Sequence, residues 1–90
     1  MSNIDIEIID FFDLLNHTFS IKFVTKWKDK YGSRFVKLFQ LKLLEYFKNS
    51  KRLKIVTLTN FLSKKCKYRE SLIEDFYDDV EISLYSPFLY

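Results

Sequence analysis

The stretch from Thr57 to Asp79 (TLTNFLSKKCKYRESLIEDFYDD) constrains the fold more than any other part of the chain. It contains two groups of apolar residues at helical spacing, each typical of one face of a short helix. The first group is Leu58, Phe61 and Leu62, and the second is Leu72, Ile73 and Phe76. Residues 63–68, between the two groups, are too polar to continue one buried stripe and too few for a long loop. The sequence therefore predicts two short helices joined by a tight turn.

This stretch resembles the helix-turn-helix family. In the family's twenty-residue unit, the fourth, eighth, tenth, fifteenth and eighteenth positions are apolar, the fifth is small and the ninth is usually glycine. With Thr59 as the first position, Ser63 takes the small position, and the apolar positions fall on Leu62, Cys66, Tyr68, Ile73 and Phe76. The ninth position is Lys67, so the turn is expected to hold a lysine where the family prefers a residue free to take positive φ. The alternative is an ordinary helical hairpin that only packs.

Length and composition favour one small, mostly helical domain over residues 1–90, with the motif at about 57–79. Ten Phe, six Tyr and one Trp supply more apolar surface than a lone domain of this size hides easily, which favours a homodimer or another partner. One Gly and one Pro leave little room for flexible linkers. The single cysteine excludes an internal disulfide and fits a reducing, cytoplasmic setting. We expect neither a signal peptide nor a membrane span, because no apolar run approaches twenty residues.

Charge is distributed in three blocks along the chain. Residues 1–16 carry a net charge of −4, residues 17–67 carry +12, and residues 68–90 carry −5. A basic block of this density, interleaved with aromatic residues, is what attraction to a polyanion requires. The two acidic ends are expected either to pair with basic surfaces of neighbouring protomers on DNA or to bind a basic protein partner.

The first half of the chain is expected to form three helices. The first runs from a cap at Ser2 or Asn3 to about residue 16, and His17 follows at its end without a visible second metal ligand. Residues 18–31 show both strand-like alternation and a helical stripe; we favour a helix capped by Ser20 and ended by Gly32. The row formed by Lys22, Lys26 and Lys30 on this helix is either a solvated face or a set of phosphate contacts.

Residues 34–48, capped by Ser33, should form the central core helix, because apolar residues cover most of its circumference and leave Lys37, Lys42 and Glu45 as the solvated side. Residues 49–52 are a basic loop, and residues 53–58 form a candidate short strand. Residues 80–85 alternate like a second strand that could pair with residues 54–57, before Ser86 and Pro87 end it. This order resembles winged-helix proteins. The expected fold is mainly α, a winged-helix-like helix-turn-helix domain with an extra N-terminal helix and a short or truncated β-wing.

Enzymatic chemistry finds no support in the sequence. The acids at 74–79 lie on one expected helix, where adjacent carboxylates are usually solvated. The sequence has no glycine-rich phosphate loop, no metal-ligand spacing and no neighbouring Cys–His pair. We therefore expect no cofactor, no metal and no small-molecule ligand.

Binding of double-stranded DNA is the leading functional expectation. The resemblance implies that the N-terminal residues of the second motif helix face base edges, where Arg69 could read guanine and Ser71 could reach a base or a phosphate. The later acids of that helix would be repelled by phosphates, so only its first turn is expected to approach DNA. The expected phosphate contacts are Lys51, Arg52, Lys54, Lys64, Lys65 and Lys67, with Tyr68 as a further hydroxyl donor if its ring is partly exposed.

Size and composition are similar to those of small DNA-binding proteins of plasmids and viruses, archaeal ones included. That likeness implies a transcriptional regulator or a partition protein that binds a centromere-like site as a homodimer and spreads on DNA. The alternative from another class is an interaction module that uses its acidic helix and apolar C-terminus, without specific DNA binding.

Overall fold

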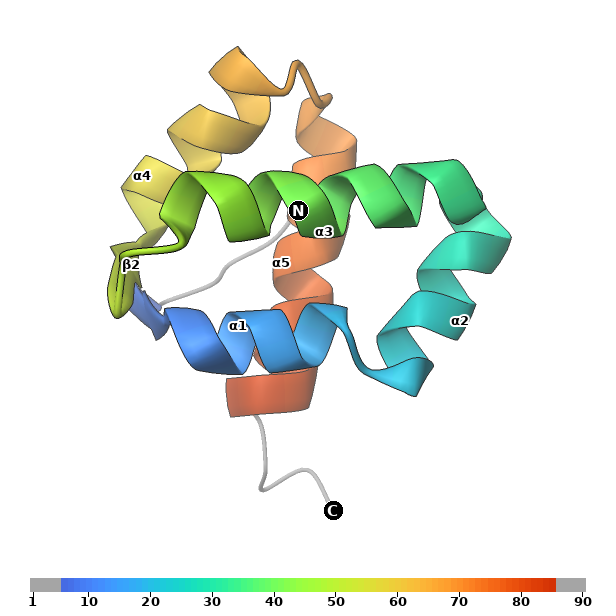
Figure 1. The fold of residues 1–90 in the computed structure, drawn as a ribbon, viewed down its shortest axis with the longest axis horizontal. Helices are drawn as coiled ribbons and strands as arrows, with labels where there is room; N and C mark the ends of the chain where they lie inside the picture. The colour runs from blue at the N-terminus through green and yellow to red at the C-terminus, as the bar shows by residue number, and fades with distance from the viewer. Residues whose placement is uncertain (1–5, 86–90) are drawn as a thin grey trace. The chain divides into compact units, whose positions relative to one another are not determined.

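The computed structural model describes residues 6–85, which are mainly helical, as predicted (Figure 1). In chain order the elements are β1 (Ile8–Asp10), α1 (Phe11–Thr18), α2 (Ile21–Tyr31), α3 (Ser33–Phe47), β2 (Arg52–Lys54), α4 (Ile55–Asn60), the π-helix η1 (Phe61–Lys65) and α5 (Glu70–Tyr85). The chain divides into two compact units. The three-helix unit is Phe11–Lys51, and the motif unit comprises residues 6–10 and 52–85 of the described chain.

In the three-helix unit, the predicted helix over residues 20–31 is confirmed by its caps. The Ser20 hydroxyl accepts a hydrogen bond from the Phe23 amide at 3.2 Å, which stabilises the first turn of α2. Gly32 ends the helix with a φ of 97°, and its amide donates to the Lys28 carbonyl at 2.9 Å. Gly32 is also the N-cap of α3, so Ser33 is the first residue of that helix rather than its predicted cap.

Stacked aromatic rings fill the space between α2 and α3. The Trp27 ring is fully buried, and its centroid lies 5.1 Å from that of Phe23 and 4.8 Å from that of Tyr31. From α3, the Phe35 and Phe39 rings stack on Trp27 at 6.1 and 6.3 Å. Each ring buries a large area and offset stacking adds to that gain, so these five rings form one aromatic stack, of which Phe23, Trp27 and Phe39 are buried in the core of this unit.

α3 buries one side and exposes leucines on the other. Val36, Phe39, Leu43 and Phe47 are buried. The expectation that apolar residues would be covered around most of the helix is wrong: three leucines are exposed, Leu38 by 45%, Leu41 by 50% and Leu44 by 40%. A helix that packs against a core on one side buries only the residues of that side, which recur at spacings of three and four.

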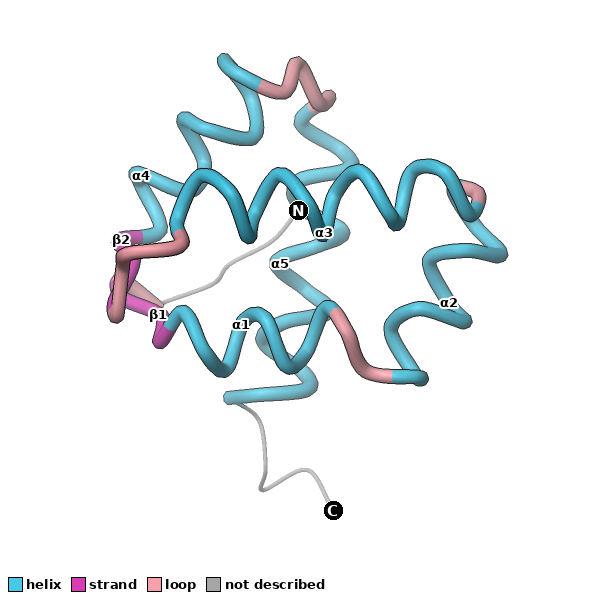
Figure 2. Tube along the Cα trace, viewed as in Figure 1, coloured by secondary structure: helices cyan, strands magenta, loops and turns pink. Residues whose placement is uncertain are grey.

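A small antiparallel sheet begins the motif unit. β1 pairs with β2 in the register Ile8–Lys54, Ile9–Leu53 and Asp10–Arg52, and Figure 2 shows the two strands side by side. The predicted first helix is therefore wrong over residues 8–10, since β-branched Ile8 and Ile9 form a strand and α1 begins only at Phe11. Its expected cap at Ser2 or Asn3 lies outside the described residues. The strand predicted over 53–58 is correct only at its start, because the chain is helical from Ile55 onward.

The strand predicted over residues 80–85 is wrong, because α5 continues to Tyr85. Val80 is buried and extends the stripe of Ile73, Phe76 and Tyr77 at spacings of three and four residues, so helical burial outweighs the local alternation. The predicted pairing with residues 54–57 is wrong for the same reason, since β2 pairs with β1 instead. The expected stop at Ser86 and Pro87 lies outside the described residues.

Candidate nucleic-acid interface

The two helices of the predicted motif are present in the motif unit. α4 continues directly into η1, so the first helical segment runs from Ile55 to Lys65, and α5 begins at Glu70. Every residue of the two predicted apolar faces is buried: Leu58, Phe61 and Leu62 on the first segment, and Leu72, Ile73 and Phe76 on the second. Two helical segments joined by residues 66–69 agree with the two helices and the tight turn predicted here, although α5 is not short and continues to Tyr85.

Lys67 takes the backbone conformation that the template gives to glycine. Its φ is 61°, and among residues 6–85 no other non-glycine residue has a positive φ. The Tyr68 amide donates to the Leu62 carbonyl at 3.0 Å, and the Cys66 amide donates to the Phe61 carbonyl at 3.0 Å. These bonds close the end of η1 around the left-handed residue. The chain therefore reverses direction at Lys67, and the carbonyls of Phe61 and Leu62 at the helix end accept hydrogen bonds from the turn.

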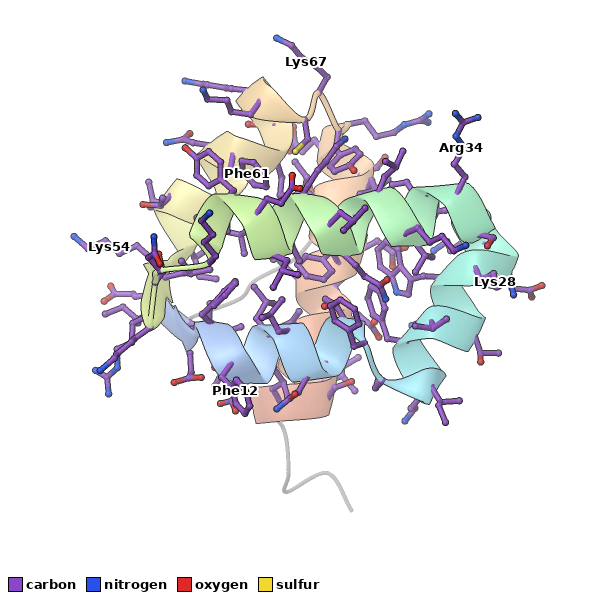
Figure 3. The ribbon with its side chains drawn as sticks, viewed as in Figure 1. Phe12, Lys28, Arg34, Lys54, Phe61 and Lys67 are labelled. Atoms are coloured by element: carbon purple, nitrogen blue, oxygen red, sulfur yellow. The ribbon has the colours of Figure 1, made fainter. Side chains whose placement is uncertain are left out.

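Four basic residues surround this reversal, and we call them the turn cluster: Lys64, Lys65, Lys67 and Arg69. All four are exposed, and the Lys67 side chain extends away from the ribbon (Figure 3). Lys64 and Lys65 lie in the last turn of η1, where cations also offset the negative end of a helix dipole. The Arg69 carbonyl accepts from the amides of Leu72 and Ile73, which holds that residue at the start of α5.

The remaining predicted contacts near the turn differ in exposure. Ser71 is exposed in the first turn of α5, whereas Tyr68 is half-buried, less buried than its apolar template position predicts. Farther along α5, Asp78 is exposed and Glu74 half-buried on the same side as Ser71. Negative charge on this side would repel a phosphate backbone beyond the first turn of the helix.

Arg52 and Lys54 lie at the opposite end of the first helical segment from the turn cluster. Both project from the exposed face of β2, since only Leu53 between them is buried. The segment of six plus five residues, α4 and η1, separates Lys54 from the turn by about 15 Å. Arg52 also sits directly opposite Asp10 in the sheet, and such a cross-strand charge pair lowers its availability to a phosphate.

Lys51 belongs to the three-helix unit, where its carbonyl accepts a hydrogen bond from the Phe11 amide at 2.9 Å. The structure thus brings together only part of the predicted site: Lys64, Lys65, Lys67 and Arg69, with Ser71 beside them on α5. Lys51, Arg52 and Lys54 form a separate basic segment.

The three-helix unit holds most of the net positive charge. It contains nine basic and three acidic residues, a net charge of +6, whereas the described part of the motif unit has a net charge of −2. Lys22, Lys26 and Lys30 are exposed along α2, and Arg34 extends outward at the start of α3 (Figure 3). The predicted site does not include Lys22, Lys26 and Lys30, although their spacing of four residues places them on one face of the helix.

A polar contact joins the two motif helices beneath the turn. The Thr59 hydroxyl donates to the Ile55 carbonyl at 2.8 Å, which uses its single proton. The Tyr77 hydroxyl therefore donates to the Thr59 oxygen, linking α5 to α4. Burial raises the pKa of Tyr77 to about 12, so the phenol stays protonated and keeps this bond at neutral pH.

Residues 6–85 lack a metal site and a membrane-spanning helix. That part of the chain holds no group of three or more His, Cys, Asp and Glu side chains placed to hold a metal ion. It also holds no helix with the length and hydrophobicity needed to cross a membrane. Comparison with protein-family models, curated proteins and solved structures gave no match for this chain.

Proposed function

We propose that this chain is a non-enzymatic protein of helix-turn-helix, winged-helix-like type that binds duplex DNA as a homodimer through its turn cluster. The observation that carries the proposal is the exposed turn, in which Lys64, Lys65 and Arg69 flank a left-handed Lys67. In the cell, such a protein would act as a transcriptional regulator or as a partition protein of a plasmid or virus.

Electrostatics supports the turn as the contact point. Four cations lie within six residues, and the N-terminal end of α5, which follows them, carries the positive pole of a helix dipole. The cations and the positive end of the helix both attract the negative oxygens of phosphate groups. Each phosphate that is neutralised also releases condensed counterions, which favours binding. Arg69 and Ser71 stand where the resemblance places base-reading residues, so they are the proposed contacts to base edges.

A mobility-shift titration with generic duplex at several salt concentrations tests the proposal. If the turn cluster engages about four phosphates, the logarithm of the affinity falls against the logarithm of salt concentration with a slope of about −3.6. The variant Lys64→Glu/Lys65→Glu removes two of these contacts, so we expect the slope to become shallower by about 2. Its far-ultraviolet circular dichroism should match the wild type, because both side chains are exposed.

A matched control carries the same change of charge on another element. Lys22→Glu/Lys26→Glu alters two exposed lysines of α2 and lowers the net charge equally. We expect it to weaken binding through the overall field while leaving the salt slope near the wild-type value. Equal loss in both variants would mean that DNA does not sit on the turn, and absence of any shift at low salt would refute DNA binding.

A second candidate function follows from the acidic face of α5. Five acidic residues follow Glu70 on this helix, and none of its residues is basic. Such a helix is suited to a basic protein surface, with DNA binding incidental. Asp78→Lys, at an exposed position, separates the two functions: we expect it to strengthen DNA binding under the first proposal and to abolish partner binding under the second.

A further inference from the structure

Three exposed leucines follow one another along the outer side of α3. Leu38, Leu41 and Leu44 are exposed by 45%, 50% and 40%. At three-residue spacing they lie about 4.5 Å apart along the axis and cover about 120° of the helix circumference. Isolated exposed leucines are ordinary, but a contiguous row opposite a buried face is typical of a contact surface.

The charges that flank this row are arranged symmetrically about Leu41. Lys37 lies four residues before Leu41 and Glu45 lies four residues after it, and both are exposed. Leu38 and Leu44 are likewise three residues before and three residues after the same residue. α3 therefore presents a surface with opposite charges at equal distances from an apolar centre.

A second copy of this helix fits such a surface when it runs antiparallel. A two-fold axis beside Leu41 places that residue against its own copy, and it brings Leu38 to the level of Leu44 in the partner. The same operation brings Lys37 to the level of Glu45, twice per dimer. The same operation brings Arg34 of one copy to the level of Lys48 of the other, a like-charge pair at each end of the contact; both side chains are exposed and long enough to extend into solvent, where salt screens their repulsion.

We propose that two copies of this chain associate through α3 in an antiparallel, two-fold symmetric contact centred on Leu41. The apolar row supplies the buried centre, and the two Lys37–Glu45 pairs fix the antiparallel direction. The contact gives the proposed DNA-binding dimer its interface. The proposed contact is argued from the geometry of α3 alone, so it can be correct whether or not the protein binds DNA.

Sedimentation equilibrium of the purified chain tests the apolar centre. We expect the wild type to be dimeric at about 100 µM chain and Leu41→Glu to raise the dissociation constant at least about tenfold. Ile21→Glu is the matched control, because Ile21 on α2 is 85% exposed and the substitution is the same. This control should leave the dissociation constant unchanged.

Charge exchange tests the direction of the contact and does not depend on how Leu41→Glu folds. Lys37→Glu alone and Glu45→Lys alone each place like charges at both pairs, so both variants should be monomeric at concentrations where the wild type is dimeric. The double variant Lys37→Glu/Glu45→Lys restores opposite charges and should dimerise again. An equimolar mixture of the two single variants should form heterodimers, because each like-charged chain then faces its complement.

A monomeric wild type at this concentration would overturn the proposal. So would a Leu41→Glu dimer as tight as the wild type, which would mean that another part of the chain, or another surface, covers or replaces this row. Failure of the mixed single variants to associate, with the double variant also monomeric, would overturn the antiparallel arrangement. A wild-type dimer that depends on Leu41 but shifts no duplex would leave this contact standing and refute only the proposed function.

Discussion

Two residues in the described part of the chain have a positive φ, Gly32 at 97° and Lys67 at 61°. At Gly32 a Cβ would meet no atom within 4 Å, so a substitution there costs only backbone strain. With its extended ψ of 155°, this conformation is nearly exclusive to glycine. We expect Gly32→Ala to lower the free energy of unfolding by about 1 to 3 kcal/mol. Urea denaturation measures the loss, and an unchanged midpoint would show that the connection between α2 and α3 does not require this conformation.

Lys67 is the reverse case, because a residue with a Cβ occupies a conformation that costs about 1–2 kcal/mol. Lys67→Gly removes that strain and pays about 0.5–1 kcal/mol for the extra freedom of glycine in the unfolded chain. We expect the free energy of unfolding, measured in denaturant, to rise by up to about 1.5 kcal/mol. Lys64→Gly, three residues earlier in η1, is the control, and it should be destabilising since glycine disfavours a helix interior.

The surroundings of Lys67 show which features of this stretch the sequence predicted and which it did not. The helical spacing of apolar residues predicted the two buried faces, but Cys66 and Tyr68, at apolar template positions, are only half-buried. Lys67, at the ninth template position, is the one non-glycine residue of residues 6–85 with a positive φ. The surface residues were less predictable. Lys54 and Lys67 both belong to a basic stretch of sequence, yet the helical segment between them places them at opposite ends. The register that sets Asp10 against Arg52 joins residues too distant in sequence for local patterns to detect.

At the scale of elements, the bond between Tyr77 and Thr59 links α5 to α4 beneath the turn. Tyr77→Phe removes the donor and leaves a ring of the same shape, so we expect the free energy of unfolding to fall by about 1 kcal/mol. Thr59→Val should cost more, because it also removes the bond to Ile55 and leaves the buried phenol without an acceptor. Equal stability of all three proteins would mean that this contact contributes nothing to the packing of the two helices.

Tyr77 also makes the stability of the motif unit depend on pH in the alkaline range. Because burial raises the pKa of Tyr77 to about 12 from its ordinary 10.0, the folded chain keeps the proton after the unfolded chain has lost it. The associated stability is fully present below about pH 10 and is lost as the pH rises toward 12. We expect the wild type to lose more stability across this range than Tyr77→Phe does. Parallel curves for the two proteins would contradict the assignment.

Element boundaries show where local patterns mislead. The alternation in VEISLY predicted a strand, but Val80 lies seven residues after Ile73 and four after Phe76 and completes the buried stripe of α5. Conversely, the helical spacing of Ile4, Ile8 and Phe11 in the sequence extended the first predicted helix over residues that form β1. In both places tertiary pairing or packing decided the outcome, since short apolar segments satisfy both periodicities.

At the scale of the whole molecule, charge separates the basic three-helix unit from the acidic face of α5. Oppositely charged surfaces of this kind attract one another between neighbouring molecules when the salt concentration is low. Salt weakens this attraction, because the Debye length falls from about 10 Å at 0.1 M to about 3 Å at 1 M. An apolar contact through Leu41 responds differently, because salt does not screen it. We therefore expect sedimentation velocity at low salt to show species larger than a dimer that revert to dimers at high salt.

Asp78→Lys distinguishes the two kinds of association. It reverses one exposed charge on α5, so it should reduce the larger species at low salt while leaving the dimer unchanged. Leu41→Glu should do the opposite and leave monomers at high salt. If both variants gave the same distribution at every salt concentration, one surface would account for all association. The distinction between an apolar contact through Leu41 and a charged contact through α5 would then be wrong.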